Sequence, residues 1–255
     1  MMQGSGADPD AGRGRLSTFD WHGCIMATLA NTQPRHDRQD WLIPGLTLAQ
    51  TRAYRDLFPP APIPAAVLVP LIDRPGGMTV LLTQRASQLK RHAGQISFPG
   101  GHIETADQGP LAAALREARE EIGLDERLVS LAGYLPDHIL LSGYRVTPVV
   151  AFVQPGFELL LDEREVEDSF EIPLSHAFEP LNHRARRRRF GQDRVDVEVW
   201  DITYGERNVW GATAGMLINL YRLCAPKGPG STTAVPDGPS QDDGGTGHST
   251  EAPDE

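Results

Sequence analysis

The sequence predicts an α/β fold, in which helices cover a central sheet. Two apolar runs, residues 65–72 and 146–153, have the length of buried strands. Residues 111–124 have the apolar spacing of an amphipathic helix, and strand-like and helix-like segments alternate along the middle of the chain. With 255 residues, of which 40% are hydrophobic, the chain is long enough to fill a core.

The elements before the amphipathic helix can be placed from turn signals. Residues 46–55 are predicted to be helical. Residues 65–72 and 78–83 are predicted to be strands joined by a turn at residues 74–77, because the sequence RPGG there contains glycines that tolerate positive φ.

The amphipathic helix and the elements after it follow from similar signals. Gly109-Pro110 indicates the start of a helix that runs to Ile122, and Gly123 is placed to cap its end. Further strands are predicted at residues 129–135, 146–153, 168–172 and 197–204, and a last helix at residues 212–223.

The two ends of the chain differ from its middle in composition. Residues 226–255 contain 5 Pro, 6 Gly and 7 Ser or Thr, with 6 acidic side chains against one lysine. This segment has almost nothing to bury, so we predict a disordered acidic tail. A similar composition at the start predicts a poorly ordered extension over residues 1–37, which leaves residues 38–225 as the folded domain.

Charge, hydropathy and cysteine usage exclude several classes of protein. The net charge of −10, from 34 acidic and 24 basic residues, disfavours general binding to nucleic acid. No stretch approaches the ~20 apolar residues that span a bilayer. Cys24 and Cys224 are too few and too far apart for a disulfide framework or a zinc site, so a reducing cytoplasm is the expected location.

The helix at residues 111–124, LAAALREAREEIGL, carries the candidate chemistry. A helical wheel places an apolar stripe toward the core, formed by Leu111, Leu115, Ala118 and Ile122. Glu117, Glu120 and Glu121 fall together on the other side, where like charges repel by about 0.2–0.5 kcal/mol per pair. A divalent cation would relieve this repulsion, and Mg²⁺ binds through a few carboxylates plus substrate phosphates.

Two interpretations of this acidic face are open from the residues alone. The first is a solvated surface, partly neutralised by Arg116 and Arg119. The second is a diphosphate–metal site, favoured by the FPGG bend at residues 98–101, where the backbone can approach a ligand closely.

Residues 101–124 resemble the Nudix box, G-x5-E-x7-R-E-U-x-E-E-x-G-U. The second half of the box, from Arg116 onward, matches completely. In the first half, Asp107 holds the acidic position when counted from Gly101, and eight residues separate it from Arg116 rather than seven. Counted back from Arg116, that position holds Gln108, so Glu104 and Asp107 are both candidates for the first acidic role.

A second resemblance is to the coenzyme A pyrophosphatases of this superfamily. Residues 81–101, LLTQRASQLKRHAGQISFPGG, are similar to the motif L-L-T-x-R-S-x-x-L-R-x-H-x-G-Q-x-x-F-P-G-G, with Ala86 and Lys90 as departures. Residues 144–150 and 210–214 also look like this subgroup. The resemblance covers roughly residues 62–223.

The resemblance implies a Nudix-type α/β/α sandwich with a mixed sheet, and cleavage of a diphosphate by water activated on Mg²⁺ or Mn²⁺. The implied metal ligands are Glu117, Glu120, Glu121 and the carbonyl of Gly101. Arg116 orients the glutamates in the family and is counted with Glu117 and Glu120 among the catalytic residues. The general base is either a helix glutamate or, as our candidate, Glu165, from the run E-V-x-x-x-F-x-x-P-L.

Substrate contacts are expected beside the glycine bend. The candidates are Arg85, Lys90, Arg91, His92, Gln95 and Gly100. A dense basic run at Arg184 and residues 186–189 is either an exposed loop or an anchor for the anionic end of the substrate.

The implied reaction converts coenzyme A or an acyl derivative to 3′,5′-ADP and (acyl-)phosphopantetheine. One alternative is a hydrolase of another nucleoside diphosphate derivative, such as ADP-ribose, NADH or a dinucleotide. A further alternative is a non-catalytic nucleotide sensor, which the retained carboxylates disfavour. The expected partner is a small-molecule substrate rather than a nucleic acid or a membrane, and the oligomeric state stays open, a homodimer included.

Overall fold

The structure is a computed structural model that describes residues 19–54, 58, 61–89, 92–140, 142–190 and 195–225. The predicted acidic tail at residues 226–255 lies outside the described residues. The helices are α2 (Trp21–Leu29), α3 (Leu48–Ala53), α4 (Pro110–Ile122), α5 (Leu174–Ala177) and α6 (Ala212–Cys224), with 3-10 turns η1 (Arg38–Asp40), η3 (Glu126–Leu128) and η4 (Pro180–Asn182). Within these ranges, no helix is both long enough and apolar enough to cross a membrane.

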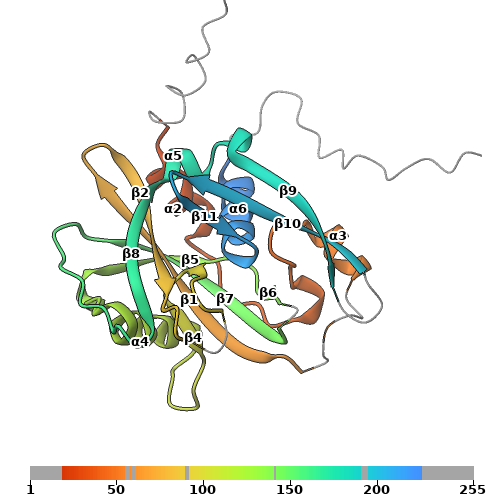
Figure 1. Ribbon diagram of the computed structural model, residues 1–255, viewed down its shortest axis with the longest axis horizontal. Helices are drawn as coiled ribbons and strands as arrows, with labels where there is room; N and C mark the ends of the chain where they lie inside the picture. The colour runs from red at the N-terminus through yellow and green to blue at the C-terminus, as the bar shows by residue number, and fades with distance from the viewer. Residues whose placement is uncertain are drawn as a thin grey trace, which may run out of the picture. The chain divides into compact units, whose positions relative to one another are not determined.

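The strands form two sheets (Figure 1). Their bounds are β1 (Ile63–Arg74), β2 (Gly77–Arg85), β3 (Ile96–Ser97), β4 (Gly100–His102), β5 (Val129–Tyr134), β6 (His138–Ile139), β7 (Tyr144–Val153), β8 (Val166–Pro173), β9 (His183–Phe190), β10 (Val195–Tyr204) and β11 (Arg207–Trp210). Among the described residues, the larger sheet has the order β3-β2-β1-β7-β5, with β4 on β1, β6 on β7 and β8 on β2. Strands β1 and β7 are parallel and the other pairs are antiparallel, so the sheet is mixed, as predicted.

Helices cover both faces of the larger sheet. Helix α4 lies on one side of β1 and β7, and α2 and α6 lie on the other (Figure 1). The core on the α4 side includes Leu68, Val149, Ala114, Ala118 and Ile122. The core on the opposite side includes Trp21, Ile25, Val150, Leu217 and Leu220. The predicted α/β/α sandwich is therefore confirmed.

Local sequence determines where α4 begins and ends. Gly109 precedes it with φ 97°, Pro110 occupies its first turn, and Gly123 ends it in the left-handed conformation at φ 68°. Proline suits the first turn because a backbone N–H there has no acceptor within the helix, so its absence costs no hydrogen bond. Glycine suits the left-handed cap because it has no Cβ. The predicted bounds of this helix are confirmed.

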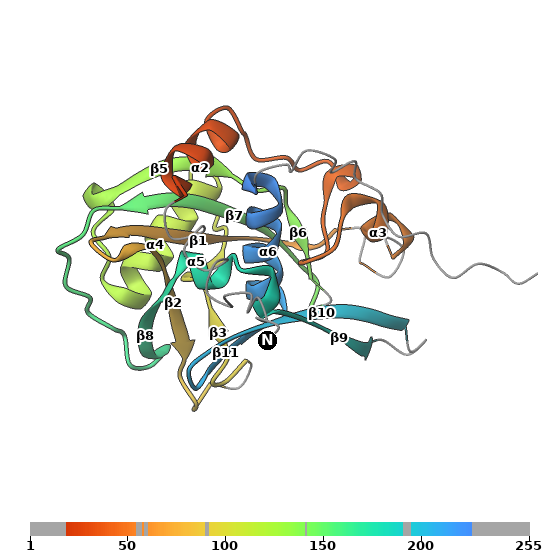
Figure 2. The ribbon, with the colours of Figure 1, turned by 90° about the horizontal axis from the view of Figure 1, so that it is seen from above.

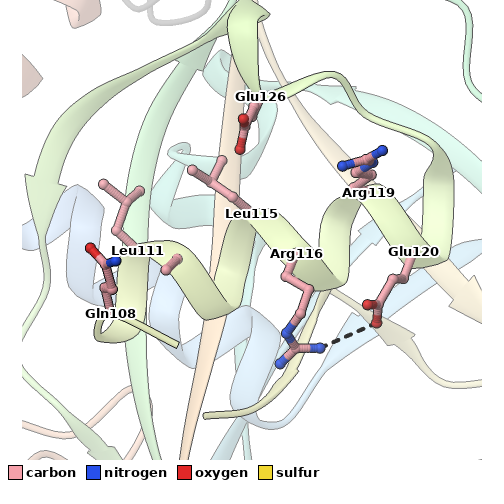
Figure 3. A pocket seen from close by; sticks show the side chains of 8 residues that line it. Gln108, Leu111, Leu115, Arg116, Arg119, Glu120 and Glu126 are labelled. Atoms are coloured by element: carbon pink, nitrogen blue, oxygen red, sulfur yellow. Dashed lines mark hydrogen bonds and ion pairs between the residues drawn. The ribbon is translucent and has the colours of Figure 1, made fainter. Parts of the chain in front are cut away.

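The predicted apolar stripe of α4 is fully buried only in its second half. Ala118 and Ile122 are buried, but Leu111 and Leu115 are half-buried beside an outward-facing groove of about 660 Å³ (Figure 3). Small residues such as Ala114 face the sheet instead and let the helix backbone approach β1 closely. This rotation of the helix brings Glu121 inward, where it is 3% exposed.

The predicted extension over residues 1–37 is wrong from residue 19 onward. Helix α2 begins after Asp20, whose carboxylate accepts a hydrogen bond from the Gly23 N–H at 2.8 Å. Trp21, Ile25 and Leu29, spaced four residues apart, are buried in the core. Composition alone misplaced this boundary because the short helix is flanked by polar sequence.

The smaller sheet has the order β11-β10-β9 among the described residues and packs beside α6 (Figure 2). The basic run at residues 184–189 lies in β9, antiparallel to β10, with Arg186 paired to the buried carboxylate of Asp201. The expectation of a loop there is therefore wrong. β11 contacts β3 and thereby brings the end of the smaller sheet to the edge of the larger one.

Candidate active site

A cavity of about 880 Å³ opens between α4, the first turn of α6 and the edge strands β3 and β4. Its polar side is formed by Arg85, Gly101, Glu117, Glu120, Glu121 and Glu165. Its apolar side is formed by Val67, Leu140, Tyr144, Val146, Trp210 and Met216. Acidic side chains, the basic side chain of Arg85 and apolar side chains thus share one cavity.

Two glycines at the floor of the cavity let the chain pass close to its neighbours. Gly100 has φ 153°, and a Cβ there would collide with the carbonyl oxygen of Ala66 on β1. A Cβ on Gly101 would overlap the carboxylate of Glu117. The adjacent strand β1 therefore requires glycine at position 100, and the Glu117 side chain of α4 requires it at position 101.

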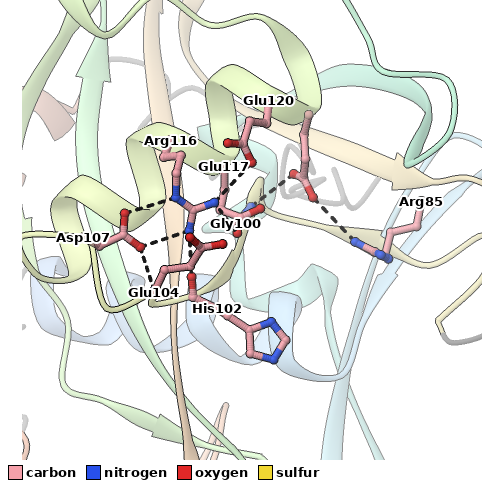
Figure 4. A network of polar contacts seen from close by, with 9 residues as sticks. Arg85, Gly100, His102, Glu104, Asp107, Arg116, Glu117 and Glu120 are labelled. Atoms are coloured by element: carbon pink, nitrogen blue, oxygen red, sulfur yellow. Dashed lines mark hydrogen bonds and ion pairs between the residues drawn. The ribbon is translucent and has the colours of Figure 1, made fainter.

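Glu121 is a buried carboxylate with limited compensation. It accepts a hydrogen bond from the Gly100 N–H at 3.2 Å, and Arg85 Nη1 lies 3.6 Å from its Oε1 (Figure 4). Burial, which disfavours the charged form, raises the pKa of Glu121 to about 8, and the nearby carboxylates of Glu117 and Glu165 add to the increase. Because it is buried, the Glu121 carboxylate needs a nearby cation to be fully ionised at neutral pH.

Arg116 holds the other two glutamates of α4. Its Nη1 donates to Glu117 Oε1 at 3.0 Å and to Glu120 Oε2 at 3.2 Å. Burial raises the pKa of Glu117, and the ion pair with Arg116 partly opposes that rise. The Glu120 side chain is 60% exposed, so it lies at the mouth of the cavity.

Asp107 fixes Arg116 from the opposite side. Arg116 Nε donates to Asp107 Oδ1 at 3.1 Å, and Nη2 donates to Asp107 Oδ2 at 3.0 Å and to the carbonyl of His102 at 3.0 Å. These hydrogen bonds lower the pKa of Asp107 below its usual value. Glu104 contributes its backbone N–H to Asp107 Oδ2 at 2.8 Å, while its side chain lines the cavity. Of the two candidates for the first acidic position, Asp107 is therefore the one that pairs with Arg116.

Most predicted substrate-contact residues gather in the same cavity. Arg85, His92, Gln95 and Gly100 all line it. His92, with φ 58°, places its Nδ1 2.8 Å from Gln95 Oε1. The predicted contacts Lys90 and Arg91 lie outside the described residues.

Glu165 lines the cavity from the turn that precedes β8. Its backbone carbonyl accepts a hydrogen bond from the Ala86 N–H at 2.8 Å, which ties this turn to the end of β2. The Glu165 charge raises the pKa of both Glu117 and Glu121, whose side chains line the same cavity.

The sequence did not predict the apolar side of the cavity. It offered the basic run at residues 184–189 as a possible substrate anchor, which the cavity lining does not support. Tyr144, whose ring meets His102 edge-on at 5.1 Å, and Trp210 lie in the stretches that resembled the coenzyme A subgroup, and that was the available signal. None of the arginines of β9 whose side chains are described lines the cavity.

The residues present fit a divalent cation by their chemistry. Carboxylate oxygens are the ligands that Mg²⁺ and Mn²⁺ prefer, and the raised pKa of Glu121 is what a nearby cation would reverse. Within the described ranges, no three His, Cys, Asp or Glu side chains enclose a metal position as they stand. Glu117 and Glu120 turn toward Arg116, and Glu121 turns toward Gly100 and Arg85.

Comparisons with known proteins find a family model and relatives that match this chain. A family model described as NUDIX domain matches residues 62–193. The uncharacterized Nudix hydrolase NudL of Enterobacter sp. (strain 638) is 41% identical over 163 residues, which cover 61% of this chain and 80% of the relative. The protein of the same description from Escherichia coli (strain K12) is 41% identical over 161 residues, with the same shares covered. Among solved structures, a binary complex of the C. elegans Ap4A hydrolase is 21% identical, has a TM-score of 0.38, and covers 46% of this chain and 83% of that chain.

Proposed function

This chain belongs to the Nudix family, and we propose that it is a diphosphatase that cleaves coenzyme A or acyl-coenzyme A to 3′,5′-ADP and (acyl-)phosphopantetheine. The observation that carries the proposal is the convergence of two separate motifs in one cavity. Arg85, Gln95 and Gly100, from the run that resembles coenzyme A pyrophosphatases, line the same cavity as Glu117 and Glu121 of the Nudix helix.

Glu117, Glu120, Glu121 and the carbonyl of Gly101 are the groups proposed to hold Mg²⁺ or Mn²⁺. When bound, such an ion neutralises phosphate oxygens and makes an attacking water more acidic. Arg116, fixed by Asp107, holds Glu117 and Glu120 in position toward the cavity.

Glu165 is the proposed general base. It lines the same cavity as Glu117 and Glu121, and a general base must come within about 2.6–3.2 Å of the water that it deprotonates. Arg85 is proposed to pair with a phosphate oxygen of the substrate, because its guanidinium lies at the cavity beside Glu121 with a long, non-ideal contact of 3.6 Å.

The two zones of the cavity suit a substrate with one anionic and one less polar part. The diphosphate belongs beside Arg85 and the glycine bend, while Leu140, Tyr144 and Trp210 offer an apolar surface to the organic part. A reducing cytoplasm is the proposed location, consistent with two free thiols, and a homodimer is compatible with the proposal.

The test is a side-by-side product analysis with coenzyme A, dephospho-coenzyme A, NADH, ADP-ribose and diadenosine polyphosphates, with added Mg²⁺. We expect coenzyme A to give 3′,5′-ADP and phosphopantetheine with the highest kcat/KM. A higher kcat/KM for ADP-ribose, NADH or a dinucleotide would reject coenzyme A as the substrate and keep the diphosphatase assignment. Binding of nucleotides without turnover of any would indicate a sensor.

A further inference from the structure

The two cysteines of the chain lie side by side although 200 residues separate them. Cys24 is in α2, and Cys224 is the last residue of α6. The Cys24 thiol donates a hydrogen bond to the carbonyl oxygen of Cys224 at 2.9 Å. The fold therefore joins the first described helix to the last at a pair of thiols.

The two thiols have different surroundings. Cys224 is 2% exposed, whereas Cys24 is only partly buried. Burial raises the pKa of the Cys224 thiol to about 12, and the adjacent Cys24 side chain adds to this increase because two thiolates so close would repel. Cys24 is accordingly the more exposed of the two residues, and Cys224 is its protected neighbour.

We propose that Cys24 and Cys224 form a reversible intramolecular disulfide when the protein meets a hydroperoxide. The Cys24 thiolate attacks one peroxide oxygen, the O–O bond breaks, and Cys24 becomes a sulfenic acid while water (or an alcohol) leaves. Cys224 then loses its proton, and its thiolate attacks the Cys24 sulfur, so that the S–S bond forms and the S–O bond breaks. The proton of Cys224 leaves with the hydroxide as water, and the peroxide is the two-electron oxidant for the whole step.

The disulfide would tie α2 to the end of α6. Helix α2 packs against β5 and α6 and covers part of the core through Trp21 and Ile25. Neither cysteine lines the catalytic cavity, so the link would resist opening of α2 without touching the catalytic groups. Transient disulfides of this kind are the ones found in reducing compartments.

The experiment uses the full chain, reduced, desalted and then exposed to hydrogen peroxide at neutral pH. We expect the intact monomer to lose two hydrogens, at a rate independent of protein concentration, and dithiothreitol to restore the original mass. Because the chain has two cysteines, such a monomer must carry the Cys24–Cys224 bond. We expect its Tm to rise by about 5–10 °C, since the closed loop is long. Folded monomers that gain oxygen atoms instead, or that become covalent dimers, would overturn the proposal.

Two variants test the order of the steps with dimedone, a reagent that traps sulfenic acids. Cys224→Ser should accumulate the trapped adduct on Cys24, whereas Cys24→Ser should give at least about tenfold less adduct. Equal trapping in both variants would contradict the assignment of Cys24 as the reacting thiol. Neither variant removes a catalytic group, so coenzyme A hydrolysis in each serves as the check that the protein is folded.

Discussion

Asp107 accepts hydrogen bonds from Arg116 on both of its carboxylate oxygens, at 3.1 Å from Nε and 3.0 Å from Nη2. This pair comes from two different elements, the loop after β4 and the middle of α4. It leaves Nη1 of Arg116 free to hold Glu117 and Glu120, so an acidic residue in the loop sets the positions of two acidic residues on the helix. A planar fork of donors makes such an arrangement possible for arginine and not for lysine.

Asp107→Asn is expected to lower kcat/KM for the preferred diphosphate by about 10–100-fold and to weaken Mn²⁺ binding by a similar factor, because outer groups that orient metal ligands contribute about this much. Steady-state kinetics and Mn²⁺ titration measure the two effects. Asp125→Asn is the matched control, since Asp125 makes the same forked pair with the exposed Arg127 and neither residue lines the cavity. Equal losses in both variants would refute a positioning role for Asp107.

Gly101→Ala is expected to reduce turnover by at least about tenfold while leaving the fold intact. The backbone at Gly101 is not in the left-handed region, so the obstacle is the Glu117 carboxylate that the new methyl group would displace. Gly76→Ala is the control, because a Cβ at that turn meets nothing within 4 Å. Turnover and circular dichroism of the two variants check the prediction, and wild-type turnover in Gly101→Ala would contradict it.

The raised pKa of Glu121 predicts a pH dependence of stability in the metal-free protein. The pKa in the folded state is about 8 against an ordinary 4.5, so the folded state holds this proton more tightly than the unfolded state. Stability is therefore lost as pH rises from about 5 toward 8, by up to roughly 3–5 kcal/mol from this group. Glu117, whose pKa is also raised, acts in the same direction.

Thermal unfolding in EDTA between pH 5 and 9 measures this dependence. Glu121→Gln should unfold at a higher temperature than wild type above pH 8, and its stability should fall less with pH. Glu120→Gln, at an exposed position of the same helix, provides the comparison. Parallel pH profiles for wild type and Glu121→Gln would show that Glu121 ionises without penalty, contrary to its burial.

Trp21→Ala is expected to destabilise the protein by about 3–5 kcal/mol, because it removes a large buried ring that meets Phe178 edge-on at 4.7 Å. Met26→Ala, on the exposed face of the same helix, should change stability by less than about 1 kcal/mol. Urea unfolding gives both values. Similar small changes in the two variants would mean that α2 adds little to the core.

Local signals predicted the elements well where the deciding residues are neighbours in sequence. The bounds of α4 follow from Gly109, Pro110 and Gly123, and the β1–β2 hairpin follows from its glycine turn. Apolar residues at positions 21, 25 and 29 mark the buried face of α2, but the polar composition around them predicts an extension rather than a helix.

The features that sequence did not predict depend on contacts between distant segments. Which face of α4 is buried is decided by how closely Ala114 and Ala118 approach β1, and a helical wheel does not contain that information. The apolar side of the cavity combines Tyr144 from β7 with Trp210 from β11, and the pairing of Cys24 with Cys224 depends on the packing of α2 against α6.

The most direct test of the account is the position of a divalent ion in crystals grown with Mn²⁺ and a non-cleavable diphosphate analogue, located by anomalous diffraction. We predict one or more Mn²⁺ peaks bounded by the carboxylates of Glu117, Glu120 and Glu121, with the diphosphate on the side of Arg85. Bound analogue with Mn²⁺ at another position, and with these three carboxylates still paired to Arg116 and Gly100, would contradict it.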